Sequence, residues 1–373
     1  MRILTYLYMK RIYHLLRLVG FLSKIKVGLV GVGNCASALV QGIEFYRNVQ
    51  RAEECIGLRH LYVGKYHPSD IEIVCAFDVS SEKVGKDLSE AIFAEPNNTL
   101  RFADVPELGV RVLKGPVLDG VSGYAKDIIK LDSSPEVDVA QSLKEAGAQI
   151  VLNLLPSGAR EASFRYAEES LRAGCAFINA TPTLIASDDS WAERYAEARL
   201  PIVGDDLTDQ VGATFLHKVL LETLNRRGVK ISKTYQLDVG GGTESAETLE
   251  RAWEAKRKIK TKSVISVLPY EAEIVAGSMD FVEFLKNSRD SYFWLEGLYF
   301  GKVPFQIDIR LSTVDAPNAG SVLFDVIRGV RIALEKGDSG HVLPISAYAF
   351  KHPTKILPLL EAEELFEEYI GNK

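Results

Sequence analysis

Apolar residues along the first half of the chain form short continuous runs rather than strict alternations. Five such runs end in glycine, proline, polar or acidic residues: 24–32, 71–79, 148–156, 175–183 and 200–206. Between them, segments such as 37–46 and 161–173 repeat apolar residues with the helical period. Strands without polar alternation that are separated by helices indicate a parallel sheet covered on both faces. The pattern therefore predicts an α/β fold with a doubly wound parallel sheet.

The pattern changes after Gly228, where three segments alternate apolar and polar residues as antiparallel strands do. These segments are 232–240, 291–300 and 303–315, and a charged helical segment, 246–260, lies among them. A long helix over 319–337, closed by Gly337, then restores the α/β style. We therefore expect a first domain over 24–230, an inserted α+β domain over 231–312, and a return segment over 313–373 that completes the first domain.

Residues 1–23 form an apolar, aromatic and basic extension ahead of the first predicted strand. Arg2, Lys10, Arg11 and Arg17 interrupt its apolar run, so it has no uncharged stretch of about 18 residues to span a bilayer. The extension also lacks the small-residue cleavage site of a secretory signal. An additional packing helix, an upstream start codon and an interfacial amphipathic helix are the alternatives for this segment.

Composition is that of an ordinary globular protein, with 47% hydrophobic and 25% charged residues. A formal net charge of -6, with acidic and basic residues mixed along the chain, provides no electrostatic surface for a nucleic acid. The four cysteines lie far apart and form no CxxC pair, unlike a zinc site or a secreted disulfide framework. We therefore expect a cytoplasmic protein without a nucleic-acid partner or a transmembrane segment.

The turn after the first predicted strand carries a candidate phosphate-binding motif. Gly31, Gly33 and Ala36 match the pattern G-x-G-x-x-G/A. The first glycine permits a tight turn, the second lets a pyrophosphate approach the backbone, and the small third residue packs the helix against the strand. The N-terminus of the helix that follows presents free N–H groups to an anion. The motif favours a dinucleotide site of Rossmann type over a purely structural turn.

Asp78 ends the second predicted strand, where a carboxylate can accept hydrogen bonds from an adenosine ribose. Such a carboxylate favours NAD over the 2′-phosphorylated cofactor. Asp78 lies 42 residues after Ala36, about twice the usual interval. We therefore expect residues 47–70 to form an inserted loop.

Six motifs follow one another from the glycine turn to the C-terminal part of the chain. They are VGLVGVGNCASALVQGIEFY (27–46), FDVSSEKVGKDLSEAIF (77–93), PNNT (96–99), GPVLDG (115–120), PIVGDDLTDQVGAT (201–214) and SAYAFK (346–351). With these motifs the chain, from about Lys24 to its end, resembles the shorter bacterial and archaeal form of the myo-inositol-1-phosphate synthase family. The resemblance implies a homotetramer with an NAD domain and an inserted catalytic domain that also mediates assembly.

The same resemblance implies an activity and a set of cofactor contacts. The activity is an isomerase reaction of inositol and phospholipid biosynthesis, in which glucose 6-phosphate becomes inositol 3-phosphate without net redox change. By resemblance, the pyrophosphate would contact Gly31, Gly33, Asn34, Cys35 and Ala36, the ribose would contact Asp78, and the cofactor cleft would be lined by Thr181, Pro182, Asp205, Asp206 and Asp315. The structural alternative is a small buried apolar side chain for Cys35 and a helix cap for the two consecutive aspartates.

The predicted catalytic half departs from the motifs of that family. The family's Gly-Asn-x-Asp after a VGG turn reads VGGGTESAE here, with Gly242 for the asparagine and Glu244 for the aspartate. The family's Ser-Asn-x-Lys stretch reads SVLPYEAE, with Val267 for the asparagine and with Pro269 and Glu273 at the positions of two lysines. Two expected cations are therefore missing from this stretch.

Other basic residues match the family more closely. Arg289 stands at the position of a third lysine, and a small shift in register would place Lys286 there instead. Lys351, in SAYAFK, matches directly. Three lysines of the segment KRKIKTK could also reach the site, or could form a solvated basic face: Lys258, Lys260 and Lys262.

These replacements bear on the chemistry. The cyclisation needs cationic donors that stabilise negatively charged oxygen, and an amine that exchanges protons near neutral pH. Proline donates no hydrogen bond, Glu273 repels a phosphate, and arginine stays protonated near pH 7. We therefore expect hydride removal to be supported and the aldol closure to be weakened. For residues 268–277 the alternative is an exposed loop that enters a helix.

Three functions remain open at this point. The first is the family reaction with a rearranged set of cations. The second is a divergent NAD-dependent dehydrogenase, epimerase or cyclase acting on another phosphorylated sugar or polyol, with Lys351 as acid and base. The third is a non-catalytic NAD-binding subunit. The resemblance also makes a divalent metal possible, with Asp315 or Asp325 as a contributor, but the sequence contains no ligand cluster of recognisable spacing.

Overall fold

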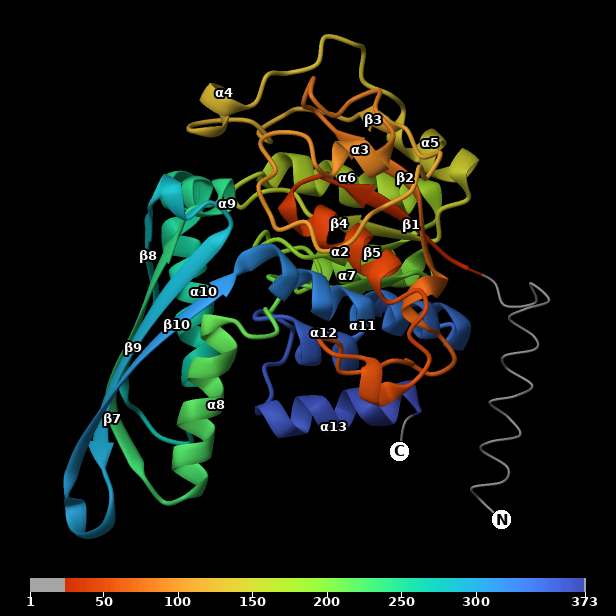
Figure 1. Cartoon of the computed structure of the whole chain (residues 1–373). Helices are drawn as coiled ribbons and strands as arrows, with labels where there is room; N and C mark the ends of the chain where they lie inside the picture. The colour runs from red at the N-terminus through yellow and green to blue at the C-terminus, as the bar shows by residue number, and fades with distance from the viewer. Residues whose placement is uncertain (1–23, 372–373) are drawn as a thin grey trace.

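The computed structural model describes residues 24–371, and two β-sheets organise this part of the chain (Figure 1). The predicted extension, residues 1–23, lies outside the described residues, so the alternatives for it stay as stated. No helix within residues 24–371 combines the length and the apolar character needed to cross a membrane.

The larger sheet has, within the described residues, seven strands that all pair in parallel, in the spatial order β11-β6-β5-β4-β1-β2-β3. The bounds of its strands are β1 (Ile25–Val30), β2 (Ile71–Asp78), β3 (Val112–Lys114), β4 (Ile150–Asn153), β5 (Ala176–Asn179), β6 (Pro201–Val203) and β11 (Gly340–His341). Strand order reverses beside β1, as in doubly wound sheets. The predicted Rossmann-type α/β fold is confirmed.

Side chains of the parallel strands point alternately into two hydrophobic cores. In β1, Ile25, Val27 and Leu29 belong to one core and Val30 to the other. The first core includes apolar residues of α2 (Asn34–Phe45) and α11 (Asp315–Lys336), and the second includes those of α5 (Val139–Ala146), α6 (Arg160–Ala173) and α7 (Asp189–Glu197). Burial on both faces explains why these strands are continuously apolar.

The second sheet has the order β10-β9-β7-β8. Its strands are β7 (Lys230–Gly240), β8 (Glu273–Phe281), β9 (Ser288–Leu298) and β10 (Pro304–Val314). β9 is antiparallel to both β7 and β10, as the alternating pattern predicts, whereas β8 is parallel to β7. Helices α8 (Ala213–Arg226) and α10 (Trp253–Ile265) cover one face of this sheet, to the left of the parallel sheet in Figure 1. Helix α8 thus packs on the second sheet although it precedes β7.

The interpretation of residues 268–277 as an exposed loop entering a helix is wrong. Residues from Glu273 onward form strand β8, which pairs with β7. Ile274 and Ala276 are buried against α10, whereas Glu273 and Val275 are exposed. This is the alternation of a half-buried strand, and it overrides the loop character of the preceding proline.

The predicted inserted loop, 47–70, contains only short 3₁₀ turns, but it is closely packed. Leu61, Val63 and Tyr66 are buried in the first core. Arg328 of α11 is itself fully buried and donates hydrogen bonds to the carbonyl oxygens of His60, Leu61 and Tyr66. These bonds attach the loop to α11.

After β10 the chain returns to the parallel sheet. Helix α11 packs against α2, and β11 extends the sheet beside β6. The chain ends in α12 (Leu343–Ala349) and α13 (Leu359–Ile370), which pack on each other. The remaining helices are α3 (Leu88–Ala91), α4 (Ala125–Ile128) and α9 (Thr243–Glu247), the last of which continues through a π-helical turn, Thr248–Ala252, into α10.

Candidate active site

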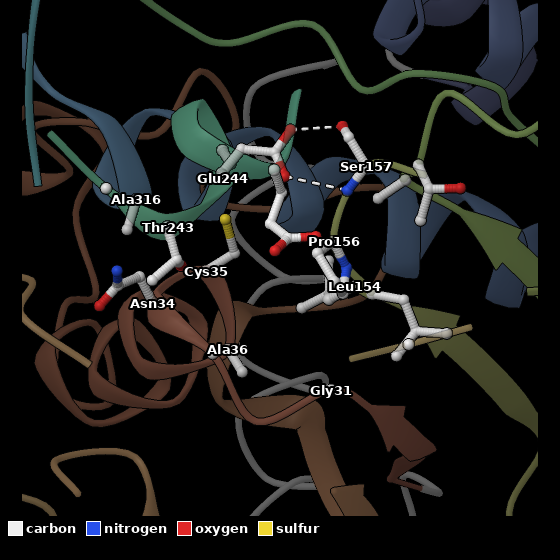
Figure 2. Close-up of a pocket in the computed structure, with 18 of the residues that line it drawn as sticks. Gly31, Asn34, Cys35, Ala36, Leu154, Pro156, Ser157, Thr243, Glu244 and Ala316 are labelled. Carbon is white, nitrogen blue, oxygen red and sulfur yellow. Dashed lines mark hydrogen bonds between the residues drawn. The ribbon is translucent and has the colours of Figure 1, made fainter. Parts of the chain in front are cut away.

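A pocket opens at the carboxyl ends of β1, β2, β4, β5 and β6 and extends to the segments that follow β7 and begin β9. This is the edge at which doubly wound sheets bind ligands. Figure 2 shows the glycine turn and the first residues of α2 on one side of the pocket, with Thr243 and Glu244 of α9 opposite them. The pocket is therefore walled by both sheets.

The glycine turn leaves room for a ligand beside the backbone. Gly31 has φ +84°, and a Cβ there would lie 3.0 Å from the carbonyl oxygen of Leu154. A Cβ on Gly33 would meet nothing within 4 Å. Gly33 is also the N-cap of α2, and no side chain caps this helix end. Open space and uncapped N–H groups at a helix N-terminus suit a phosphate group.

Asp78 lies at the end of β2 and lines the pocket. Its Oδ2 accepts a hydrogen bond from the backbone N–H of Val32 at 2.9 Å, and its Oδ1 accepts from those of Val79 and Ser80 at 2.8 and 2.9 Å. The buried amine of Lys83 lies 4.0 Å from Oδ2. The carboxylate is therefore fixed in the pocket wall, and its assignment as a ribose ligand stays a prediction. Lys83 is a pocket residue that sequence reasoning missed.

Asn34 and Cys35, the first two residues of α2, both line the pocket. Asn34 Oδ1 accepts hydrogen bonds from the backbone N–H groups of Asn98 and Thr99, so it also anchors the PNNT loop. Burial raises the pKa of the Cys35 thiol, which keeps it protonated at neutral pH. Ala36 follows in the same wall.

The residues after β5 and β6 divide into two groups. Thr181, Pro182 and Asp206 line the pocket. Asp205 is fully buried outside it and accepts hydrogen bonds from the backbone N–H groups of residues 185–187, from the Ser187 hydroxyl and from the Asn179 amide. Asp205 therefore holds the turn before α7 together, and its assignment to the cofactor cleft is corrected.

Besides Lys83, four buried cationic side chains line the pocket, and each is paired with one carboxylate. The pairs are Lys256 with Glu244, Lys260 with Asp238, Arg289 with Asp315, and Lys351 with Asp206. The cations come from α10, from the start of β9 and from the segment after α12. Because each charge has an opposite partner, burial does not force these groups to neutralise.

Lys256 joins the two walls of the pocket. Its amine donates hydrogen bonds to Glu244 Oε1 and, at 3.2 Å, to Ser157 Oγ on the parallel-sheet side. Ser157 in turn donates to the same carboxylate through its hydroxyl and its backbone N–H (Figure 2). Burial alone would raise the pKa of Glu244, but Lys256 and these donors lower it to about 2. Glu244 is therefore an acceptor that holds Lys256 as an ammonium.

Arg289 is held against the N-terminus of α11. Its Nη2 donates to Asp315 Oδ2 at 2.7 Å. Asn287 orders this segment, because its carbonyl oxygen and its Oδ1 accept from the backbone N–H groups of Asp315 and Ala316. Arg289 Nε is buried and has no hydrogen-bond partner within the described chain. A donor left over in a pocket wall suits an anionic ligand.

Lys351 lies beside Asp206 at the end of β6. Its amine donates to Asp206 Oδ1 at 3.0 Å and to the carbonyl oxygen of Leu207. Asp206 Oδ2 is buried and accepts no hydrogen bond from any residue of 24–371. Lys351 and Asp206 therefore bring a hydrogen-bond donor and an acceptor oxygen without a partner in the described chain to the same part of the pocket.

The two positions that the motif comparison matched to family lysines, Pro269 and Glu273, do not line the pocket. Pro269 is exposed outside the pocket, and Glu273 is 79% exposed at the beginning of β8. Lys256 and Lys260, which stand four residues apart, lie on the pocket-facing side of α10. Residues four apart share one face of a helix, so both lysines reach the pocket. Two of the four cations thus come from α10, which precedes the SVLPYEAE stretch.

Of the other basic candidates, one lines the pocket and the others are exposed to solvent. Arg289 lines the pocket, whereas Lys286 is exposed on the turn before β9, so the shifted register is wrong. Lys258 is 75% exposed and pairs with Glu254, and Lys262 is exposed. Asp209 also lines the pocket and was missed, although it belongs to the quoted motif PIVGDDLTDQVGAT.

The residues proposed for a metal do not fit one. Asp315 is engaged by Arg289, and Asp325 lies outside the pocket with its oxygens bound to Arg328, His60 and Tyr348. In the described part of the chain no group of three or more histidine, cysteine, aspartate or glutamate side chains is arranged to hold a metal ion.

Known proteins of one family are similar to this chain over most of its length. The family model of myo-inositol-1-phosphate synthase matches residues 212–316. The chain is 44% identical over 352 residues to the inositol-3-phosphate synthase of Mycobacterium tuberculosis, covering 93% of this chain and 96% of that protein. It is 42% identical over 357 residues to the inositol-3-phosphate synthase of Corynebacterium glutamicum, covering 93% and 98%.

A solved structure supports the fold. The crystal structure of a myo-inositol-1-phosphate synthase-related protein from Thermotoga maritima matches with a TM-score of 0.76 at 24% identity, covering 93% of this chain and 98% of that chain. The predicted resemblance is confirmed by the two closely related synthases. The chain belongs to the myo-inositol-1-phosphate synthase family.

Proposed function

We propose that this protein is an inositol-3-phosphate synthase, which cyclises glucose 6-phosphate with bound NAD and no net redox change. One observation carries the proposal. The glycine turn at the N-terminus of α2 and the four cations that pair with carboxylates line the same pocket. A nucleotide cradle and a cluster of cations are the two parts that an oxidation followed by an aldol closure requires.

The cofactor side of the pocket is suited to NAD. The uncapped N-terminus of α2 and the open space at Gly33 favour the pyrophosphate there, and Asp78, which lines the pocket at the end of β2, would accept hydrogen bonds from the ribose. NAD held there would supply the hydride acceptor for oxidation of the sugar and the hydride donor for the final reduction. Thr181, Pro182 and Asp315 would then border the cofactor where it meets the cations.

The cationic side of the pocket would act on the sugar phosphate. Arg289, with its free Nε, suits the phosphate, and Lys256 and Lys260 suit the oxygens that become negative during enolisation and ring closure. Lys351 and Asp206 provide an amine and a carboxylate oxygen that can exchange a proton with the substrate. All four cations are in place, so the aldol half of the reaction is supplied with donors.

The direct test is to incubate the purified full-length protein with NAD and glucose 6-phosphate and to follow the products by NMR. We expect inositol phosphate to form with no accumulation of free NADH. Accumulation of NADH in step with an oxidised sugar would instead favour a dehydrogenase. Binding of NAD without conversion of the sugar, with or without added divalent cations, would favour a non-catalytic subunit.

The two alternative functions lose their main support. Both a divergent sugar-phosphate enzyme and a non-catalytic subunit rest on the absence of lysines from SVLPYEAE. Lys256 and Lys260 line the pocket, and Arg289 and Lys351 complete the set. We therefore retain the family reaction as the function of this chain.

We also propose a homotetramer in the cytoplasm. The face of the second sheet turned away from α8 and α10 exposes apolar side chains of three adjacent strands, namely Tyr235, Leu237, Val275 and Tyr292, each 36–41% exposed. A contiguous apolar sheet face of this kind favours contact with another copy of the chain. All four cysteines are free, as expected for a reducing compartment.

A further inference from the structure

Lys260 lines the pocket, but the carboxylate that pairs with it, Asp238, does not. Its amine lies 2.7 Å from Asp238 Oδ2, and both side chains are buried. The carboxylates of the other three pairs, Glu244, Asp206 and Asp315, line the pocket formed by residues 24–371, and Asp238 lies outside it. A bound substrate can therefore touch Lys260 but not Asp238.

Asp238 is itself fixed by donors on both oxygens. Ser291 of β9 donates its hydroxyl to Oδ1 at 2.7 Å. The side-chain amide of Gln236, on the same strand, donates to Oδ1 at 3.1 Å and to Oδ2 at 2.9 Å. A carboxylate that accepts several hydrogen bonds stays ionised and has little freedom to rotate.

The bracing continues away from the pocket into α8. Gln236 Oε1 lies 3.3 Å from His217 Nδ1, and His217 Nε2 lies 2.8 Å from Thr234 Oγ1. All three side chains are buried, and burial lowers the pKa of His217 to about 4, so the ring is neutral at physiological pH. Because the ring carries no charge, hydrogen bonds orient the side-chain amide of Gln236.

Strand β8 leaves space for the aliphatic part of the Lys260 side chain. Gly277 of β8 has φ +86°, and a Cβ at this position would lie 2.6 Å from Lys260 Cδ. A side chain on β8 would therefore displace the lysine. Strand β8 positions the stem, and β7 positions the ammonium.

Asp238 counteracts the effects of burial and of nearby cations on the pKa of Lys260. Burial lowers the pKa of Lys260, and three nearby cations lower it further, namely Arg289, Lys256 and Lys351. Asp238 is the charge that opposes this shift. Lys260 stabilises the charge of Asp238 in return. Burial would raise the pKa of Asp238, but Lys260 and Arg289 lower it to about 2.

We propose that Asp238, braced by Gln236 and Ser291, is a positioning residue that keeps Lys260 protonated and directed into the pocket as a fixed cation for the sugar phosphate. This inference rests on the proposed function, because glucose 6-phosphate is the probe. It makes β7 part of the catalytic apparatus although Asp238 contacts no reacting atom.

The test replaces Asp238 by an uncharged residue of the same shape. In Asp238→Asn we expect the alkaline limb of the pH profile of kcat to move down by about one pH unit or more, because a charge within about 4 Å shifts a pKa by roughly 1–3 units. Binding of glucose 6-phosphate to the NAD-loaded protein should weaken about tenfold at pH 8 and less at pH 6. The dissociation constant for NAD should not change.

Two variants separate positioning from general damage. In a Lys260→Met background, Asp238→Asn should weaken glucose 6-phosphate binding no further, because it acts through the missing amine. Gln236→Leu keeps the carboxylate but removes its amide donors, and it should move the same limb in the same direction by a smaller amount. It decides the question if Asp238→Asn does not fold. Asp104→Asn, at a side chain 95% exposed, is the matched control.

Outcomes for the inference and for the function differ. An unchanged pH profile in both Asp238→Asn and Gln236→Leu, or an additive loss in the Lys260→Met background, would overturn the positioning role. Failure of the unmodified protein to bind or convert glucose 6-phosphate would instead reject the proposed function.

Discussion

At the residue scale, Asp78 connects the end of β2 to the glycine turn, because it accepts a hydrogen bond from Val32 in that turn. Asp78→Ala removes this acceptor and the proposed ribose ligand. Charge-assisted hydrogen bonds contribute about 1.5–3 kcal/mol each, so we expect NAD binding to weaken roughly 10- to 100-fold. Calorimetric titration with NAD measures this directly.

The control for that variant is Asp87→Ala. Asp87 also accepts hydrogen bonds from backbone N–H groups, at the N-cap of α3, but it lies outside the pocket. It should lower the melting temperature without changing the dissociation constant for NAD. An equal loss of NAD affinity in both variants, or none in Asp78→Ala, would reject Asp78 as the ribose ligand.

Two consecutive aspartates show what sequence alone could not resolve at this scale. Asp205 and Asp206 both follow β6, and the motif places both near the carboxyl edge of the sheet. Neighbouring side chains leave the backbone in different directions, so one is buried beneath the turn before α7 and the other faces the pocket beside Lys351. Which of the two faces the pocket depends on packing partners 18 or more residues away, and no local pattern encodes that.

At the scale of elements, α10 presents its lysines on two faces. Lys256 and Lys260 line the pocket, whereas Lys258 is exposed to solvent and paired with Glu254. Lys256→Met should reduce kcat by roughly 10²–10³-fold, the usual cost of removing one preorganised electrostatic donor. Lys258→Met makes the same change one face away and should leave kcat within about twofold. Steady-state inositol phosphate formation compares them.

A Lys258→Met variant as impaired as Lys256→Met would show that helix charge, not placement in the pocket, matters. A Lys256→Met variant with normal kcat would remove Lys256 from the mechanism. Retained NAD affinity in both variants would establish that the parallel sheet is intact.

The same helix explains why the catalytic half was harder to predict than the fold. Parallel strands buried on both faces are continuously apolar, so β1, β2, β4, β5 and β6 could be predicted from local composition, whereas the short edge strands β3 and β11 were not predicted. Lysines at positions four apart are equally common on solvated helix faces, and only the packing of α10 on β8 decides which face is inside. Matching the linear motif at 266–273 therefore pointed to Pro269, between α10 and β8, and to Glu273, at the start of β8, neither of which lines the pocket.

At the scale of the whole molecule, the pocket depends on both sheets. The parallel sheet contributes the glycine turn, Asp78 and Asp206, and the second sheet with its helices contributes Lys256, Lys260 and Arg289. The Lys256–Glu244–Ser157 contact joins the two parts directly. The sequence predicted three strands of the second sheet but not β8. The contact that closes the pocket joins Ser157 and Glu244, which are 87 residues apart, and only the folded chain brings them together.

The outer face of the second sheet leads to a prediction about assembly. Leu237, 41% exposed, lies among Tyr235, Val275 and Tyr292 on this face. If the face is covered by another copy, Leu237→Glu buries an unpaired carboxylate there, and the dissociation constant of the assembly should rise at least tenfold, about 1.4 kcal/mol. Leu100→Glu, at a side chain 59% exposed away from this sheet, should leave the assembly unchanged. Light scattering over a dilution series measures both, and a Leu237→Glu variant that keeps the molar mass of the unmodified protein at every concentration would remove this face from the interface.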